Sequence, residues 1–440
     1  MPHFDGQFKY RAAVRPLLSP YARHSMSSQT RHVAFFLPTF PAGGQEQTTL
    51  LLMKGLVERG HRVDLLLERK TGAYLSRVPD AIRVHELRRR SRWSGYRRFI
   101  TGWPSEGFRH LYGSLGLGQR SIPLHRLIAL VDYMESQRPN VVISAHDRAP
   151  LLAVWAAGIA RQRVATVIIE RSIFSRNFAA SRADARTHKI MQHRLTLMRR
   201  LYPMADMRVA VSNGAAADLA DILGLPRSAV RTMYNPVVRP ELTARAAEFV
   251  DDRWIHNDDV PLIVTAGRLA PEKAQHVLVD AFARLRARGV DARLAILGEG
   301  PERERLTHRI AEHGLEAHVR MPGWAENPYA WMARSSLCVL PSEFEGLPNT
   351  LIEAMACGCP VVATDCPGGT REILADGAHG RLVPVGDSDA LAEAMALTLA
   401  NPPSPAELQA RAAEFSLERS VDAYEAEIER LCTRPPDRHA

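Results

Sequence analysis

The chain has 440 residues, 46% of them apolar and 24% charged, so it is long enough for two domains of ordinary size and has the composition of a soluble globular protein. Its apolar runs are far shorter than a membrane span, and residues 1–30 carry scattered charges without the apolar core of a signal peptide. We expect these residues to form a loosely ordered leader. The five cysteines lack the spacing of a disulfide framework or a metal site, which indicates a reduced, cytoplasmic setting.

The net charge of +9 has a local excess in RRRSRWSGYRRF, Arg88–Phe99, where six arginines stand among large aromatic residues. One interpretation is a solvated loop without a partner. The other is a surface that binds anionic lipid head groups. Because no nucleic-acid-binding module is recognisable, nucleic acid is not expected as a partner. We expect a cytoplasmic protein and, in the second interpretation, one that rests on the inner face of a membrane.

Short apolar runs alternate with helical patterns through residues 31–250, which we assign to one domain. The strand-like runs are HVAFFLP (32–38), HRVDLLLE (61–68), NVVISA (140–145), RVATVII (163–169) and MRVAVS (207–212). Buried strands joined by helices indicate a parallel sheet with helices on both faces. The fold class is therefore α/β.

A polar stretch, RAAEFVDDRWIHNDD (245–259), interrupts the alternation and is expected to be the linker. The pattern restarts at VPLIVTAG and continues through residues 260–415, which predicts a second doubly wound, Rossmann-like domain. Ligands of such sheets bind beyond the carboxyl ends of the strands. A cleft between the two domains is the expected site.

The segment PSEFEGLPNTLIEAM places two carboxylates, Glu345 and Glu353, at a loop and at the start of the helix that follows. Carboxylates accept hydrogen bonds from hydroxyls, and the N–H groups of Asn349, Thr350 and Leu351 at the helix start are expected to be free to hold phosphate. Together these groups predict a site for a nucleoside-diphosphate sugar. The alternative is that Glu353 only complements the helix dipole and Glu345 is solvated.

Two cations, Arg268 and Lys273, follow the strand of the second domain that ends at TAG. A guanidinium fork and an ammonium suit one diphosphate, although both residues would also be ordinary surface cations. The glycines of LGEGPERERL are weak evidence for a binding turn. Gly43 and Gly44, between the first strand and its helix, allow close approach of a phosphate or acceptor, or form a plain tight turn.

The set GRLAPEK, LGEGPERERL, PSEFEGLPNTLIEAMACGCPVVATD and CPGGTREIL resembles the retaining glycosyltransferases of family 4, which have the GT-B fold. The resemblance covers roughly Arg31–Leu431 and is strongest over Val260–Val385. The tail FSLERSVDAYEAEIERL is similar to the last helix of that family, so residues 416–432 are expected to cross back onto the N-terminal domain.

The resemblance implies roles for these residues. Arg268 and Lys273 would neutralise the departing diphosphate, and Glu345 would face the transferred sugar. The other donor-binding residues would be Gly267, Gly298, Phe344, Gly346, Leu347, Asn349, Thr350, Leu351 and Glu353, the last on the ribose. The acceptor and phosphate loops would hold Gly43, Gly44, Arg171 and His146. No metal or other cofactor is expected, and the anomeric configuration would be retained.

One departure concerns Glu170 and Arg171, which stand where many family members have a His-Gly or His-Thr pair. This looks like the branch that extends lipid-linked oligosaccharides with hexose or N-acetylhexosamine from UDP donors. Arg171 would contact the donor phosphate or the acceptor, or would form a structural pair with Glu170. His146, at another strand end, is a second candidate for the missing histidine.

We therefore expect a metal-independent, retaining hexosyltransferase that moves a hexose or N-acetylhexosamine from a UDP-sugar to a glycan or lipid-linked oligosaccharide in cell-surface polysaccharide synthesis. One alternative is a mannosyltransferase that uses GDP-mannose. Further alternatives are a UDP-sugar epimerase and a non-catalytic binder of sugar nucleotides.

Overall fold

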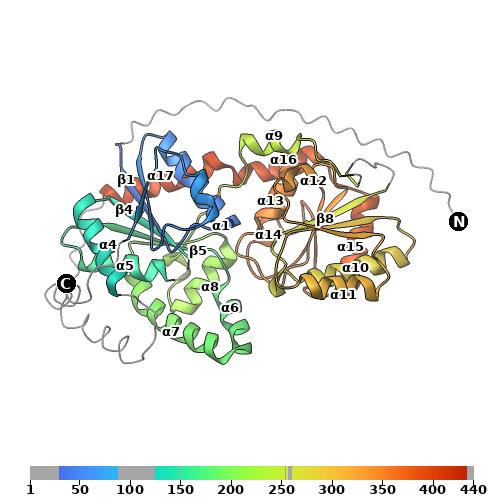
Figure 1. Ribbon diagram of the computed structural model, residues 1–440, viewed down its shortest axis with the longest axis horizontal. Coiled ribbons are helices and arrows are strands. Elements are labelled where there is room, and N and C mark those ends of the chain that lie inside the picture. Colours follow the sequence, from blue (N-terminus) through green and yellow to red (C-terminus); the bar gives the residue numbers. More distant parts are fainter. Residues whose placement is uncertain (1–28, 88–123, 147, 253, 256–259, 434–440) are drawn as a thin grey trace. The chain divides into compact units, whose positions relative to one another are not determined.

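The computed structural model describes residues 29–87, 124–146, 148–252, 254–255 and 260–433 (Figure 1). The basic segment Arg88–Phe99, for which a membrane contact was considered, lies outside these residues, as does nearly all of the expected leader. Within the described residues the chain forms two compact units. The N-terminal unit contains residues 29–236 and 417–433, and the C-terminal unit contains residues 237–416.

The described part of the N-terminal unit is built on a seven-stranded parallel sheet with the order β3-β2-β1-β4-β5-β6-β7. Its strands are β1 (His32–Leu37), β2 (Arg62–Leu67), β3 (Arg83–Glu86), β4 (Val141–Ala145), β5 (Ala165–Glu170), β6 (Met207–Ala210) and β7 (Arg231–Thr232). Every residue of β1, β4 and β5 is buried. The continuous apolar runs of the sequence correspond to this burial, because helices cover both faces of a parallel sheet.

Helices connect these strands and pack on one another, α1 against α17 and α4 against α5. They are α1 (Gly44–Glu58), α4 (Leu124–Gln137), α5 (Ala149–Ile159), α6 (Phe174–Ala180), α7 (Ala185–Leu201), α8 (Asn213–Leu223) and α17 (Leu417–Thr433), with the 3-10 turns η1 (Ala73–Arg77), η2 (Ser181–Ala183), η3 (Tyr202–Met204) and η4 (Arg227–Ala229). The order of the strands reverses between β1 and β4, which pair directly. Ligands of doubly wound sheets bind at such a reversal.

The C-terminal unit repeats this architecture with a six-stranded parallel sheet, in the order β10-β9-β8-β11-β12-β13. Its strands are β8 (Leu262–Ala266), β9 (Arg293–Leu297), β10 (Val319–Gly323), β11 (Leu337–Leu340), β12 (Val361–Thr364) and β13 (Arg381–Val383). The reversal lies between β8 and β11, which pair directly. The predicted α/β fold class is confirmed in both units.

The helices of the C-terminal unit include a pair, α10 and α15, that closes over the large apolar core. The helices are α9 (Pro240–Ala246), α10 (Gln275–Ala287), α11 (Arg303–Glu312), α12 (Pro328–Met332), α13 (Asn349–Ala356), α14 (Thr370–Ile373), α15 (Ser388–Ala400) and α16 (Pro405–Ala412), with the 3-10 turns η5 (Pro271–Lys273) and η6 (Ala413–Phe415). Across the described residues of both units, no helix has the length and apolar character needed to cross a lipid bilayer.

The boundary between the units falls between residues 236 and 237, ahead of the polar stretch at residues 245–259 where the sequence predicted a linker. The backbone N–H groups of Val237 and Val238 donate to the carbonyl of Phe415 at 3.0 and 3.1 Å. Within the polar stretch, Trp254 is 6% exposed and lies under the Arg320 guanidinium, 4.7 Å from the ring centroid. These contacts join the segment to the C-terminal unit.

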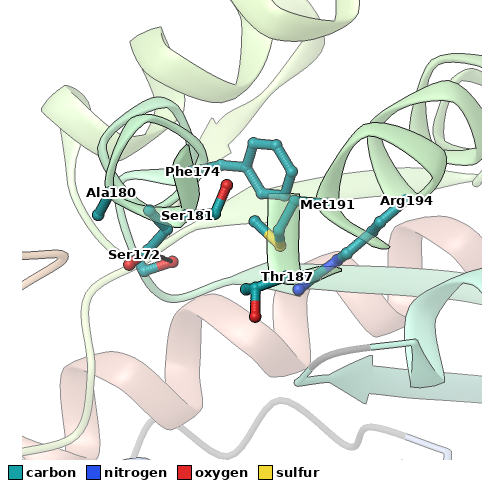
Figure 2. Close-up of a pocket in the computed structure, with 8 residues that line it drawn as sticks. Ser172, Phe174, Ala180, Ser181, Thr187, Met191 and Arg194 are labelled. Atoms are coloured by element: carbon teal, nitrogen blue, oxygen red, sulfur yellow. Dashed lines mark hydrogen bonds between the residues drawn. The ribbon is translucent and has the colours of Figure 1, made fainter. Parts of the chain in front are cut away.

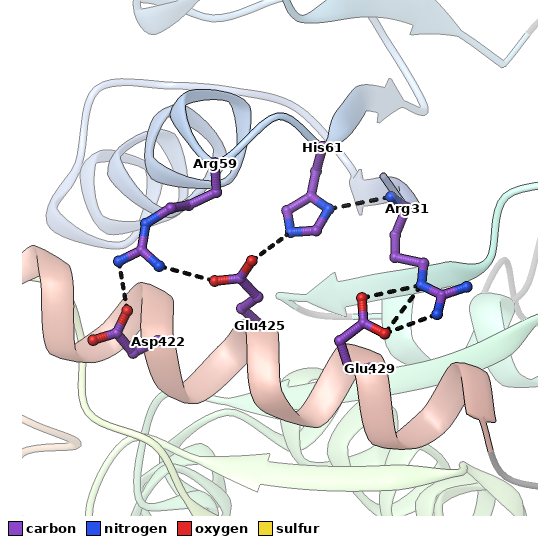
Figure 3. Close-up of polar contacts among 6 residues, drawn as sticks. All are labelled: Arg31, Arg59, His61, Asp422, Glu425 and Glu429. Carbon is purple, nitrogen blue, oxygen red and sulfur yellow. Dashed lines mark hydrogen bonds and ion pairs between the residues drawn. The ribbon is translucent and has the colours of Figure 1, made fainter. Parts of the chain in front are cut away.

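Helix α17 belongs to the N-terminal unit although it ends the described chain (Figure 3). Arg59 makes ion pairs with Asp422 at 2.5 Å and with Glu425 at 3.0 Å, and the ring of His61 lies 3.2 Å from Glu425. A Cβ on Gly55 of α1 would lie 2.3 Å from the Val421 side chain, so the glycine permits the close approach of the two helices. Charge and shape together hold this distant segment against α1.

Candidate active site

The strongest constellation of predicted residues lies in the C-terminal unit, where the loops after β8 and β11 meet. The Lys273 ammonium, from η5, is 2.6 Å from Oε1 of Glu345, in the loop after β11. Ser342 donates to the same oxygen at 2.7 Å. Glu345 is 8% exposed, and the Lys273 side chain is 26% exposed. The structure therefore brings two of the three predicted catalytic residues into direct contact at the reversal of the strand order.

Neighbouring loops fix the backbone around Glu345. The N–H of Glu345 donates to the carbonyl of Pro367 at 3.0 Å, and the N–H of Gly369 donates to the carbonyl of Gly346 at 3.0 Å. Gly368 has φ of +127°, and a Cβ there would lie 1.6 Å from the carbonyl oxygen of Glu345. Gly368 of the CPGG segment is thus needed to position the Glu345 loop.

Arg268, the third predicted catalytic residue, has a more exposed environment. Its guanidinium lies 2.6 Å from Glu272, and its side chain is 67% exposed. Its backbone carbonyl accepts from the side chain of Gln275 at 3.0 Å, which ties the loop to the start of α10. Since exposed ion pairs are weak, the guanidinium can exchange Glu272 for an incoming anion at low cost.

The glycines at the ends of β8 and β9 support each other. A Cβ on Gly298, whose φ is +138°, would lie 1.9 Å from the carbonyl oxygen of Gly267. The N–H of Gly267 donates to the carbonyl of Leu297 at 2.9 Å. These two predicted donor-site residues therefore set the shape of the site floor through backbone packing.

Glu353 lies on the side of α13 that faces away from the core, and it is half-buried. The hydroxyl of Tyr329, on α12, donates to its Oε1 at 3.2 Å and accepts from Arg239 at 3.1 Å. Burial raises the pKa of the Glu353 carboxyl, while the charges of Arg239 and Arg245 oppose the shift. The sequence analysis did not anticipate Tyr329, because its contact with Glu353 depends on how the two successive helices α12 and α13 pack.

The start of α13 corrects one detail of the sequence analysis. The N–H of Leu351 is not free, because it donates to the carbonyl of Pro348 at 3.1 Å. The hydroxyl of Thr350 donates to the carbonyl of Ala266 at 3.1 Å and so ties the helix start to the end of β8. Phe344 is partly exposed and Leu347 is 7% exposed. The helix start is thus anchored beside the Glu345 loop.

In the N-terminal unit, Arg171 follows β5 and reaches the first turns of α1. Its guanidinium donates to the carbonyl of Gln45 at 3.0 Å, to the hydroxyl of Thr49 at 2.9 Å and to the hydroxyl of Thr48. Burial lowers the pKa of Arg171. Glu170 instead accepts from the backbone N–H of Arg171 and from the Ser172 hydroxyl, at 3.1 and 2.9 Å. The alternative of a structural ion pair between the Arg171 and Glu170 side chains is wrong.

The other predicted N-terminal residues gather around Glu46. Gly43 caps α1 and Gly44 begins it, and Glu46 in the first turn is 7% exposed. His146 follows β4 with φ of +69°, and its Nε2 lies 3.4 Å from Oε1 of Glu46. Desolvation, reinforced by the charge of Arg171, lowers the pKa of His146 to about 4, while desolvation raises the pKa of Glu46. The imidazole is therefore neutral at pH 7.

Glu46 is a polar residue of this site that the sequence analysis missed. The available signal was a carboxylate in the first turn of a helix directly after the Gly-Gly pair, where the helix dipole favours negative charge. Its burial and its contact with His146 depend on the pairing of β1 with β4.

A cavity of about 400 Å³ opens next to this cluster, between α6, η2 and α7 (Figure 2). Its lining residues are Ser172, Phe174, Asn177, Ala180, Ser181, Thr187, Met191 and Arg194. Asn177 donates to the hydroxyl of Ser172 at 3.1 Å, and the Arg194 guanidinium lies 5.4 Å from the centre of the Phe174 ring. Hydroxyls, an aromatic face and a cation therefore line a space large enough for a sugar residue.

In the described residues, no group of three or more His, Cys, Asp or Glu side chains is placed to hold a metal ion.

Comparison with protein families matches both parts of the chain. Residues 42–239 match the model described as Glycosyltransferase Family 4, and residues 247–415 match the model described as Glycosyl transferases group 1. The chain belongs to glycosyltransferase family 4. The first match covers the Gly43–Gly44 turn and the Arg171 cluster, and the second covers the Lys273–Glu345 pair.

Curated relatives of this family 4 chain include an N-acetylgalactosamine-N,N'-diacetylbacillosaminyl-diphospho-undecaprenol 4-alpha-N-acetylgalactosaminyltransferase of Campylobacter jejuni. It is 34% identical over 193 residues, which are 43% of this chain and 50% of the relative. A GDP-mannose-dependent alpha-(1-6)-phosphatidylinositol monomannoside mannosyltransferase of Mycolicibacterium smegmatis is 27% identical over 74% of this chain and 84% of its own. The chain spans about half the length of several of the curated relatives it matches.

Solved structures share the fold of this family 4 chain. The Anabaena protein HepE in complex with UDP and glucose superposes with a TM-score of 0.69 at 20% identity, over 90% of this chain and 98% of that chain. The predicted GT-B fold is thereby confirmed.

Proposed function

We propose that the chain is a retaining glycosyltransferase that transfers a hexose or N-acetylhexosamine from a UDP-sugar to a lipid-linked glycan or a growing polysaccharide. The observation that carries this proposal is the contact of Lys273 with Glu345 beyond the carboxyl ends of β8 and β11. A cation and a carboxylate at that position supply one group for a diphosphate and one for sugar hydroxyls.

In the proposed reaction, the site must promote the departure of a nucleoside diphosphate from the anomeric carbon of the donor sugar. Negative charge grows on the diphosphate as the glycosidic bond breaks, and a preorganised cation lowers the energy of that state. Lys273 is held ready by Glu345 and is partly exposed, while Arg268 is held only by an exposed ion pair. Both cations can therefore turn to the diphosphate, so no metal is required in the proposal.

The names of the relatives support the donor and acceptor classes. The Campylobacter relative is named for transfer of N-acetylgalactosamine to a diphospho-undecaprenol acceptor, and a relative in Escherichia coli is named as a putative colanic acid biosynthesis glycosyltransferase. The Anabaena neighbour was crystallised with UDP-glucose. A hydroxyl-lined cavity beside Arg171 offers room for a sugar of the acceptor.

The second candidate is transfer of mannose from GDP-mannose. The mycobacterial relative, which is named for that donor, aligns over 74% of this chain. A UDP-sugar and GDP-mannose would make the same diphosphate contacts, so the preference for uracil or guanine must be tested directly.

The test is thermal unfolding with UDP, GDP and ADP, followed by panels of UDP-sugars and GDP-sugars. A nucleotide at about 100 times its Kd stabilises the native state by roughly 2.7 kcal/mol, so a clear rise in Tm is expected with UDP. A rise with GDP alone would favour mannosyl transfer. No rise with any nucleotide would contradict the proposal. For an active donor, NMR of the product should show the anomeric configuration of the donor.

A further inference from the structure

The segment from Arg171 to Met204, which contains α6, η2, α7 and η3, is called here the basic hairpin. It holds eight of the chain's Lys and Arg residues and one acidic residue, Asp184. These 34 residues therefore contribute a net charge of +7 to a chain whose total is +9. So strong a local excess produces an electrostatic surface that attracts anions.

Most of this charge is directed to solvent. Arg171 is bonded to α1 and Arg194 is partly buried, but the remaining six cations are exposed. They are Arg176, Arg182, Arg186, Lys189, Arg199 and Arg200. Within the part of the chain that the structure describes, no salt bridge neutralises the side chains of Arg182, Arg186 and Lys189.

Exposed apolar side chains accompany the cations. Ile190 is 47% exposed and Met204 is 51% exposed, and large apolar residues with such exposure are few in the described chain. Ile190 stands four residues after Arg186 on α7 and next to Lys189. Residues spaced by three or four lie on one face of a helix, so Arg186 shares a face of α7 with the exposed Ile190.

The hairpin is ordered by its own contacts. Asp184, its single acid, caps α7 by accepting from the backbone N–H groups of Arg186 and Thr187 at 3.3 and 2.9 Å. The first half of α7 also lines the cavity described above, through Thr187, Met191 and Arg194 (Figure 2). Asp184 therefore serves the helix start, where its carboxylate also interacts with the charge of Arg186. It is the single acid against the eight cations of the hairpin.

We propose that the basic hairpin docks on an anionic lipid bilayer, with its exposed cations against the lipid head groups and Ile190 at the boundary with the acyl chains. Cations attract the negative surface, and an exposed apolar side chain beside Arg186 adds a short-range contact that favours a bilayer over a free anion. Nucleic acid is disfavoured as the partner, because binding of single strands uses exposed aromatic rings. The rings of Phe174 and Phe178 instead stack on each other, with centroids 6.4 Å apart.

The experiment measures co-sedimentation of the full chain with two kinds of vesicle. One contains phosphatidylcholine alone, and the other contains phosphatidylcholine with about 30% phosphatidylglycerol, which makes it anionic. Binding to the anionic vesicles is expected, falling steeply between low salt and roughly 0.5 M salt. The triple variant Arg182→Gln, Arg186→Gln, Lys189→Gln should bind about 100-fold more weakly. Gln is a good helix former, so α7 should remain folded, which circular dichroism and the Tm would check.

A matched control removes three exposed cations elsewhere, with Arg161→Gln, Arg288→Gln and Arg381→Gln. This control has the same net charge as the triple variant and should bind nearly as the unmodified chain does. The variant Ile190→Ser, with charge unchanged, should bind about three- to tenfold more weakly, since it loses apolar area.

Three outcomes would overturn the proposal. They are equal binding to neutral and anionic vesicles, equal losses in the triple variant and its control, and binding to a single-stranded oligonucleotide without binding to vesicles. The assay contains no donor or acceptor, so its result is independent of whether the proposed glycosyl transfer is correct.

Discussion

In the C-terminal unit, a lysine at the strand ends faces a carboxylate: Lys273 lies 2.6 Å from Glu345, and its side chain remains 26% exposed. In the N-terminal unit, the cation at the strand ends faces neutral oxygens: Arg171 donates to the carbonyl of Gln45 and to threonine hydroxyls of α1. The first cation is accessible and can change its partner. The second is enclosed in a network that a change of partner would break.

This difference separates two uses of charge on the same architecture. An accessible ion pair suits stabilisation of a leaving group, because the cation is preorganised and still reaches the ligand. An enclosed guanidinium suits positioning, because each lost hydrogen bond leaves a buried group unsatisfied. Variants of the first kind should therefore change turnover more than stability, and variants of the second kind should do the reverse.

The largest effect is expected for Lys273→Ala. Turnover should fall about 100- to 1,000-fold, the scale for loss of one charge stabiliser. The Tm should also fall, because the buried Glu345 loses its cation. The measurement is release of the nucleoside diphosphate with saturating donor. The matched control is Arg284→Ala, which breaks an ion pair of 2.6 Å with Asp389 away from the strand-end loops and should keep near-normal turnover. Equal turnover in both variants would refute the assignment of Lys273 to the leaving group.

The next effect concerns pH and His146. Since the folded-state pKa is lowered to about 4, the unfolded chain takes up a proton first as the pH falls from about 6.5. The contribution of neutral His146 to stability is complete above pH 6.5 and is lost progressively toward pH 4, by about 3 kcal/mol in total. Glu46, whose pKa is raised, offsets part of this loss at the acidic end.

His146→Asn should remove that dependence, and asparagine tolerates the positive φ of this position. Unfolding by urea at pH 7 and at pH 4.5 measures the effect. The control His308→Asn changes an exposed histidine of α11 and should leave the pH dependence as it is. An identical pH dependence in His146→Asn and the unmodified chain would show that His146 is not enclosed as described.

A smaller loss is expected for Arg171→Lys. Lysine keeps the charge but lacks the fork that contacts Gln45, Thr48 and Thr49 together, so the free energy of unfolding should fall by about 2 kcal/mol. Arg186→Lys, on the exposed face of α7, should change it by less than about 0.5 kcal/mol. If Arg171→Lys were as stable as the unmodified chain while turnover collapsed, Arg171 would belong with Lys273.

The smallest effects are expected where α17 meets α1 (Figure 3). Asp422→Asn removes an exposed ion pair with Arg59 and should cost less than about 1 kcal/mol. Glu425→Gln should cost more, because Glu425 contacts both Arg59 and the buried His61. Denaturant unfolding of the two single variants measures the difference. Equal costs would show that the contact with His61 adds nothing.

Much of the fold and part of the site could be predicted from local patterns. Continuous apolar runs such as residues 32–38 and 163–169 indicated buried parallel strands, because only such strands are apolar on both faces. The pairing of Lys273 with Glu345 agrees with the placement of both residues just after strands of one sheet. Glycine was needed at position 368 for a reason that local pattern does not reveal, namely the close carbonyl of Glu345.

The remaining features depend on contacts between different elements of the fold. The order of the strands places β4 beside β1, and this neighbourhood encloses Glu46 with His146. Tyr329 meets Glu353 because α12 and α13 pack together. The boundary between the units falls at residues 236 and 237 because the following backbone bonds to Phe415. The hydrophobic pattern of the sequence predicts whether a residue is buried. Which residue it then contacts depends on how the helices and strands pack, and a local pattern does not contain that information.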